Sequence, residues 1–301
     1  MVEVVRGERR GRRWHRIAHG LHADGPCTLE QRLRGWALVL PESAVWTHLT
    51  AAEVRGWWLP NALPHPAFAA VGPGDRHPQR RALSVCRLQC SPEAEVVRGV
   101  RLASGSETLL AAARDLTVLD LVPLADSALR SGDCTVDDLA LVAASGRPGS
   151  AVLRSVLPLL DSRSESAWES VMRVLHRAAG IAVEPQHRVL DGAGRFVARA
   201  DLWLVGTRRL HEYDGEVHRD RRAHRSDLDR DRRLLDAGWQ RHGYTAPEVL
   251  RGGPLLASVD AALGRRWDGA RLVGWRQLVD ASWWGAGGRA RAGARWPDLG
   301  C

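Results

Sequence analysis

The sequence predicts an α/β protein in which a mixed sheet flanked by helices follows a smaller α+β domain. An amphipathic helix begins at the capping residue Ser166, and its apolar residues keep a 3.6-residue period until Gly180. Two runs with β-strand character then flank the turn Gly206-Thr207, and a charged helix and a short strand follow. The expected meander, helix and last strand cover 186–190, 196–205, 208–213, 219–237 and 239–242.

Short helices and strands alternate in the first half. Capping patterns at Thr28 and Thr50 open two of the helices. Strands are expected over 14–22, 67–71 and 82–88, and further helices over 106–116, 118–130 and 135–144. The pattern breaks at Gly146-Arg-Pro-Gly149, and the segment Asp161–Ser164 is the expected domain boundary.

Three domains follow from these breaks. Residues 1–160 form an α+β domain, for which a DNA-binding or regulatory role is open. Residues 161–262 form the core with the mixed sheet. Residues 263–301 carry one helix with Trp275 and Trp283, followed by a flexible tail rich in Arg and Gly.

Charge and composition narrow the function classes. The chain has 301 residues and a net charge of +8, and all of its 43 basic residues are arginine. Such a balance favours a polyanionic partner, of which DNA is one. No apolar run reaches the roughly 18 residues that cross a bilayer, and no secretory leader is recognisable. The five scattered cysteines indicate reduced thiols. We expect a cytoplasmic protein with no membrane segment and no organic cofactor.

The hairpin in the second half brings acidic residues together. A two-residue turn at Gly206-Thr207 places Asp201 opposite Glu212 and Trp203 opposite Leu210. Directly opposed carboxylates are about 5 Å apart at Cβ and repel each other. They therefore need a cation or a shared proton. A hard divalent cation such as Mg²⁺ suits two such carboxylates. Alternatively, the hairpin is exposed and carries the two acids on a face that water solvates.

Several neighbouring residues have two interpretations. Asp214 is either a metal ligand or the partner of Arg199 in a cross-strand ion pair. Glu169 is either a third ligand or simply the acid that the third position of a capped helix prefers. His218 follows the turn after Asp214, close to the acids, whereas His211 points to the other face of its strand.

Two groups of residues are assigned to surface and core. Alternating charges over 225–232 indicate a solvated helix face. The tryptophans Trp168, Trp203 and Trp239 are expected in the core rather than as platforms for bases.

A run of motifs over residues 164–250 resembles one family. The family is a group of bacterial proteins of unknown function whose endonuclease-like domain is similar to the very-short-patch-repair endonucleases of the PD-(D/E)XK superfamily. The motifs are Glu169 at a helix start, Pro185-Gln186, Ala200-Asp201-Leu202, Glu212-Tyr213-Asp214-Gly215, His218, Asp227-Leu-Asp-Arg230 and Ala237-Gly238-Trp239. Residues 28–160 more weakly resemble N-terminal regions related to abortive-infection type IV antitoxins, which begin with a winged helix.

The resemblance implies a restriction-endonuclease-like core that hydrolyses phosphodiester bonds in DNA. It implies that Asp201 and Glu212 hold Mg²⁺ or Mn²⁺, that Glu169 supports them, and that His218 serves as acid or base. The chain departs from the family pattern in two respects. Asp214 stands where the superfamily has lysine, and the arginine that the family often has shortly after the Gly-Trp pair is shifted or altered in Trp239-Gln-Arg-His-Gly243. The alternative is a non-catalytic DNA-binding regulator of the antitoxin kind. A winged helix within 1–60 would favour this regulator, and the complete set of three acids favours the enzyme.

Overall fold

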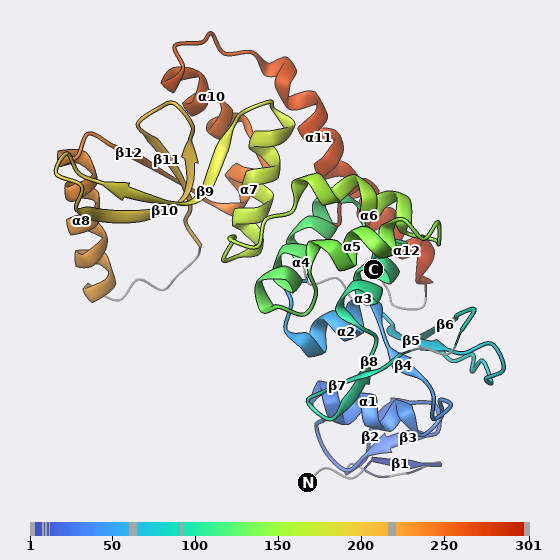
Figure 1. Ribbon diagram of the computed structural model, residues 1–301. Helices are drawn as coiled ribbons and strands as arrows, with labels where there is room; N and C mark the ends of the chain where they lie inside the picture. Colours follow the sequence, from blue (N-terminus) through green and yellow to red (C-terminus); the bar gives the residue numbers. More distant parts are fainter. Residues whose placement is uncertain are drawn as a thin grey trace.

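The computed structural model describes residues 4–7, 9, 11, 13–59, 65–90, 93–215 and 221–297, with the side chains of 18 and 221–227 left out (Figure 1). Within these ranges the strands form three sheets, one of three, one of five and one of four strands. The chain therefore belongs to the mixed α/β class, as predicted. Across the described residues, no helix combines the length and the apolar character that crossing a bilayer requires.

The small first sheet is antiparallel and has the order β1-β3-β2. We predicted a single strand over 14–22; instead the chain reverses at Gly20, whose φ of 69° suits a residue without a side chain. The predicted capping box at Thr28 is confirmed, because Thr28 and Gln31 each accept a hydrogen bond from the other's backbone. The elements are β1 (Val4–Arg6), β2 (His15–Ala18), β3 (Leu21–Ala23) and α1 (Leu29–Ala37).

The second sheet is mixed and has the order β6-β5-β4-β8-β7. We predicted that Thr50 caps the next helix, but Thr47 holds the cap position. The hydroxyl of Thr50 is instead buried and accepts a hydrogen bond from the backbone of Phe68 at 2.8 Å. The elements are β4 (Val45–Trp46), α2 (His48–Arg55), β5 (Ala67–Val71), β6 (Leu83–Arg87), β7 (Glu95–Val97) and β8 (Val100–Leu102).

The described part of 1–60 bears on the regulator alternative. A helix-turn-helix unit needs two helices joined by a short turn. Here α1 and α2 are separated by β4, so the described residues 4–7, 9, 11 and 13–59 show no such pair.

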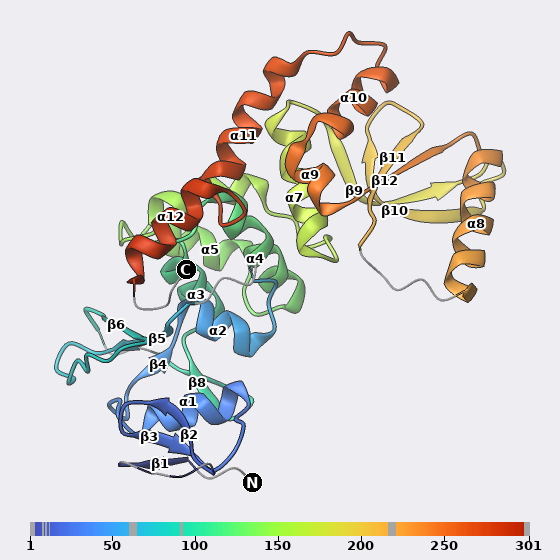
Figure 2. The same cartoon turned by 180° about the vertical axis from the view of Figure 1, so that it is seen from behind.

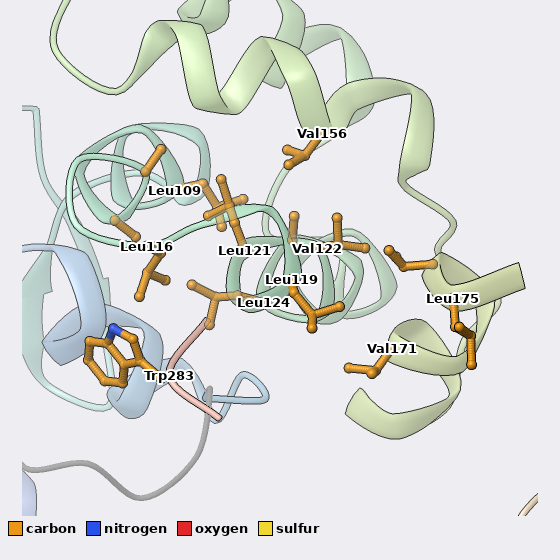
Figure 3. Packing of buried hydrophobic residues seen from close by; sticks show 14 of the residues in the cluster. Leu109, Leu116, Leu119, Leu121, Val122, Leu124, Val156, Val171, Leu175 and Trp283 are labelled. Atoms are coloured by element: carbon orange, nitrogen blue, oxygen red, sulfur yellow. The ribbon is translucent and has the colours of Figure 1, made fainter. Parts of the chain in front are cut away.

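A layer of helices packs beside the second sheet (Figures 1 and 2). Its centre is α4, in which every residue from Leu119 to Ala128 is buried. Figure 3 shows the leucines of this helix in contact with side chains from several neighbouring elements. The helices are α3 (Gly105–Ala112), α4 (Val118–Ser131), α5 (Val136–Ala143) and α6 (Ser150–Val156), followed by the short turn η1 (Leu157–Leu159).

The end of the chain returns to this helical layer (Figure 2). The prediction of a flexible tail was wrong, because the Gly-, Ala- and Arg-rich segment forms α12 between two buried tryptophans, Trp283 and Trp296. The backbone N–H of Trp283 donates to Asp120 of α4 at 2.9 Å, and its ring lies near Leu124 in Figure 3. The elements are η2 (Gly269–Arg271), α11 (Leu272–Ala281) and α12 (Ala286–Arg295).

The third sheet forms the centre of the second half and has the order β12-β11-β10-β9. β9, β10 and β11 are antiparallel neighbours, and β12 pairs with β11 in parallel after the crossover through α8. α7 covers one face and α8 the other (Figure 1). The predicted order of helix, meander, helix and strand is confirmed. The elements are α7 (Ala167–Ala178), β9 (Val183–Leu190), β10 (Phe196–Leu204), β11 (Arg209–Tyr213), α8 (Arg221–Asp236), β12 (Gln240–Tyr244), α9 (Ala246–Arg251) and α10 (Gly253–Ala262).

A buried ion pair joins the two halves where α4 packs on α7. Asp126 and Arg173 are both fully buried, and the guanidinium of Arg173 donates to the carboxylate of Asp126. The same carboxylate accepts from the hydroxyl of Ser170 at 2.6 Å and from the backbone of Asp161 at 2.8 Å. Burial raises the pKa of Asp126 to about 6, against the attraction of Arg173. The residues on either side of position 160 therefore share one core.

Candidate active site at the β10–β11 hairpin

Glu169 lies in the first turn of α7. The hydroxyl of Ser166 caps the helix by accepting the backbone N–H of Glu169 at 3.2 Å. The carboxylate of Glu169, however, accepts from the backbone of Glu165 at 2.8 Å and from the amide of Gln186 at 2.7 Å. Gln186 is on β9 and has a left-handed φ of 55°. The acid of Glu169 is thus directed to the sheet rather than to the backbone of Ser166.

The register of the hairpin places the two central acids next to each other. Leu202 pairs with His211 and Trp203 with Leu210, so the predicted Trp203–Leu210 register is confirmed. Because the strands are antiparallel, the same register brings Asp201, which precedes Leu202, beside Glu212, which follows His211. The side chain of Trp168, next to Glu169 in the chain, stacks on Tyr213 with ring centroids 5.6 Å apart. This stacking holds the start of α7 over the end of β11.

Asp201 is half-buried among acids. Its carboxylate accepts a hydrogen bond from the backbone of Tyr213 at 2.9 Å. Burial raises the pKa of Asp201 to about 7, and the charges of Glu169 and Glu212 add to the rise; the Tyr213 N–H and Arg230 oppose it. Asp201 therefore keeps its proton to a higher pH than an ordinary aspartate does. A nearby cation would favour the charged form.

Glu212 is buried, and its carboxylate is bound by the guanidinium groups of two arginines. The guanidinium of Arg230, on α8, donates to both of its oxygens, one of them at 3.0 Å. Arg241, on β12, donates from Nε to Glu212 at 2.5 Å and from a terminal nitrogen to Asp214 at 2.7 Å. Burial lowers the pKa of Arg241, but Glu212, Asp214 and Asp231 outweigh it and raise this pKa above its usual range.

Two interpretations of the charged residues were wrong. The cross-strand pair between Arg199 and Asp214 does not form, because Arg199 donates to Glu165 at 2.6 Å and Asp214 is held by Arg241. Arg230 was assigned to a solvated helix face, but it turns toward the sheet and binds Glu212. The buried carboxylate of Glu212 explains the position of Arg230, because a buried acid needs a cation beside it.

The remaining predicted residues lie as follows. His211 points to the opposite face of β11, as expected, where its Nδ1 is 2.9 Å from Nε2 of His176. Trp239 is buried, also as expected, and Trp203 is partly buried against the same cluster. His218 falls outside the described residues.

Three contributors were not found from the sequence: Gln186, Arg230 and Arg241. Gly243 is one position in the sequence that could have indicated the role of Arg241. In the parallel register Glu212 pairs with Gly243, so Arg241, two residues earlier, lies on the same face as Glu212. A Cβ on Gly243 would lie 1.9 Å from a carboxylate oxygen of Asp214, so glycine leaves room for this acid.

Two of the three acids, Asp201 and Glu169, suit a divalent cation, whereas Glu212 is bound by arginines. Among the described residues, no three His, Cys, Asp or Glu side chains are positioned together as ligands of one metal ion. Asp201 and Glu169 are close enough for the charge of one to raise the pKa of the other, and a hard cation suits such a pair. Both oxygens of Glu212 are bound by Arg230 and Arg241, so Glu212 could join only after an arginine releases it.

Comparison with known proteins identifies relatives in Mycobacterium tuberculosis. The uncharacterized protein MT2308 of strain CDC 1551 / Oshkosh and the uncharacterized protein Rv2248 of a second strain are each 27% identical to this chain over 262 residues. The similarity covers 86% of this chain and 94% of each relative, so it includes both the helical half and the sheet around Asp201. No family model and no solved structure matches the chain.

Proposed function

We propose that the chain is a DNA endonuclease that depends on Mg²⁺ or Mn²⁺ and hydrolyses phosphodiester bonds, with α7 to β12 as a restriction-endonuclease-like core. The observation that carries the proposal is the environment of Asp201. Burial and the charges of Glu169 and Glu212 raise its pKa to about 7. Among the described residues, no cation forms an ion pair with Asp201, and an acid buried at this cost is typical of a catalytic or metal-binding site.

The residues of the site divide into two groups. Asp201 and Glu169 would hold the cation, and Glu212 would join them on release from its arginines. A bound divalent cation supplies an activated water and steadies the charge on the leaving oxygen. Arg230 and Arg241 bring fixed positive charge to a place where the chain has no lysine. Guanidinium groups bind phosphate oxygens in a bidentate manner, so these two arginines would position the phosphodiester.

The test is a nicking assay on supercoiled plasmid and on single-stranded DNA, with Mg²⁺, Mn²⁺ or a chelator. The variant Asp201→Asn keeps the shape of the side chain and its bond from Tyr213, but removes the charge. We expect it to abolish cleavage. The matched control is Asp229→Asn, an exposed acid on α8 that pairs with Arg232 at 3.6 Å, and it should cleave like the wild type.

A second readout separates chemistry from metal binding. Mg²⁺ or Mn²⁺ should raise the melting temperature of the wild type and of Asp229→Asn, but not that of Asp201→Asn. Equal cleavage by Asp201→Asn and wild type would place the chemistry elsewhere. A wild type that cleaves no nucleic acid and shows no metal-dependent shift would refute the proposal.

A further inference from the structure

A pocket outside the acidic site is lined by residues of the first half of the chain and by Arg295 of α12. It has a volume of about 830 Å³, within the range of pockets that bind small organic molecules. β5 and β6 form one wall, and α3 forms another together with Arg114 and Asp115, which follow its end. The apolar lining includes Phe68, Val85, Leu88, Leu110 and Ala111.

His48 fixes one wall of this pocket. It has a left-handed φ of 55°, which is strained for a residue with a side chain. The backbone N–H of Leu49 donates to its Nδ1 at 2.7 Å, so the proton is on Nε2, which donates to Asp115 at 3.1 Å. The imidazole stacks on Phe68 with ring centroids 3.9 Å apart. Three contacts therefore hold this wall in place before any ligand binds.

The C-terminal helix supplies another wall. Arg295, at the end of α12, donates from Nε to Asp115 at 3.0 Å. Asp115 thus receives hydrogen bonds from both His48 and Arg295, and its charge is balanced. Arg147, also in the lining, binds Glu107 through two hydrogen bonds of 2.5 and 3.0 Å.

Arg114 differs from these arginines. It follows α3 and lies close enough to Cys86 of β6 for its charge to favour the thiolate, although burial raises the pKa of Cys86. In the part of the chain that the structure describes, Arg114 forms no ion pair with a carboxylate, whereas Arg147 and Arg295 both do. Among the described lining residues, four arginines (Arg87, Arg114, Arg147 and Arg295) face three acids (Glu93, Glu107 and Asp115), so the lining carries one positive charge in excess beside its apolar surface.

We propose that this pocket binds a small amphiphilic organic anion. A carboxylate or phosphate group would pair with Arg114, and an aromatic or aliphatic body would lie against Phe68, Val85 and Leu110. Burying a charged group is favourable only with a partner of opposite charge, and Arg114 supplies it. This inference is independent of the proposed nuclease activity and would survive its failure.

The probe is 8-anilinonaphthalene-1-sulfonate, an amphiphilic anion whose fluorescence rises in apolar surroundings. Its binding is titrated on the wild type, on Arg114→Gln and on Ala111→Phe, which fills the pocket without changing charge. The matched control is Arg101→Gln, an exposed arginine on β8 outside the lining. We expect Arg114→Gln to weaken binding at least about tenfold, as loss of one charge-assisted hydrogen bond predicts. Ala111→Phe should remove most of the signal, and Arg101→Gln should bind like the wild type.

Competition then defines the ligand chemistry. 3-Phenylpropanoate and phenyl phosphate should displace the dye, and the more effective of the two identifies the preferred anionic group. The neutral 3-phenylpropanol and inorganic phosphate should each be at least about tenfold weaker. Equal dye binding by Arg114→Gln and Arg101→Gln would overturn the proposal, even if Ala111→Phe fails to fold. Displacement by the alcohol or by inorganic phosphate alone, as effective as by the aromatic anions, would overturn it as well.

Discussion

Arg241 binds Glu212 through its Nε at 2.5 Å, and this contact joins β12 to β11 at the centre of the acidic site. A terminal nitrogen of the same guanidinium binds Asp214 at 2.7 Å. One side chain thus binds two acids on one face of the sheet, and Arg230 also binds the first of them, Glu212.

Replacing Arg241 by Gln should therefore destabilise the protein. We expect a loss of about 2 kcal/mol in the free energy of unfolding, the size of one hydrogen bond to a charged group with its partner left buried. Urea denaturation measures it. The control Arg232→Gln removes an arginine that is 77% exposed and should change stability by less than about 0.5 kcal/mol. In the double variant with Glu212→Gln the two losses should not add, and strict additivity would contradict the pairing.

Asp201 makes stability depend on pH with a definite sign. Its folded pKa of about 7 is above the usual value of 3.8, so between these values the folded protein binds more protons than the unfolded chain. Stability should therefore fall as pH rises through this window. Asp201→Asn lacks this dependence. Its melting temperature should exceed that of the wild type more at about pH 8 than at about pH 5.

The control for this titration is Asp236→Asn, which changes an exposed acid on α8 outside the site. The difference in melting temperature between Asp236→Asn and the wild type should not grow as pH rises. A difference for Asp201→Asn that shrinks as pH rises would mean that the charged form of Asp201 is favoured in the folded protein.

The buried pair of Asp126 and Arg173 predicts a large loss when one partner is removed. Asp126→Ala leaves a fully buried guanidinium without its acid and should cost about 3–5 kcal/mol. The double variant Asp126→Ala with Arg173→Met removes both charges and should cost less than the single variant. The exposed pair Asp229–Arg232 is the control, because Asp229→Ala should cost at most about 1 kcal/mol. Chemical denaturation that gives equal losses for both single variants would contradict this account.

The C-terminal helix offers a test with two tryptophans. Trp296 is 7% exposed and packs edge to face on Phe68 and Trp283, whereas Trp267 is 44% exposed. Trp296→Ala should lower the free energy of unfolding by about 3–5 kcal/mol. Trp267→Ala should lower it far less. If guanidinium denaturation showed equally small effects of both substitutions, the packing of α12 against the first half would be contradicted.

Local signals predicted much of this structure. The helix starts at Thr28 and Ser166 depend on capping residues a few positions away, and both are found. The hairpin register depends on a short turn, and the Trp203–Leu210 pair confirms it. In these cases the physical cause lies within about a dozen residues of the feature, so the sequence contains it.

The remaining features depend on distant partners. Arg230 and Arg241 reach Glu212 only because α8 crosses over and returns β12 beside β11. Thr50 resembles a cap in the sequence, yet its hydroxyl is bound by Phe68, 18 positions later. The composition of 286–295 suggests flexibility, and only the burial of the flanking tryptophans makes it a packed helix. No short-range pattern could have shown these three outcomes.

The return of α12 to the first half has a consequence for synthesis. α4 leaves the ribosome long before Trp283 and Trp296, because domains are made from the N-terminus onward. Until those residues emerge, the leucines of α4 that Trp283 covers face water and are open to chaperones and to neighbouring nascent chains. The first half can therefore complete its core only when translation has almost ended, and premature termination anywhere after α4 would release a chain with an open apolar surface.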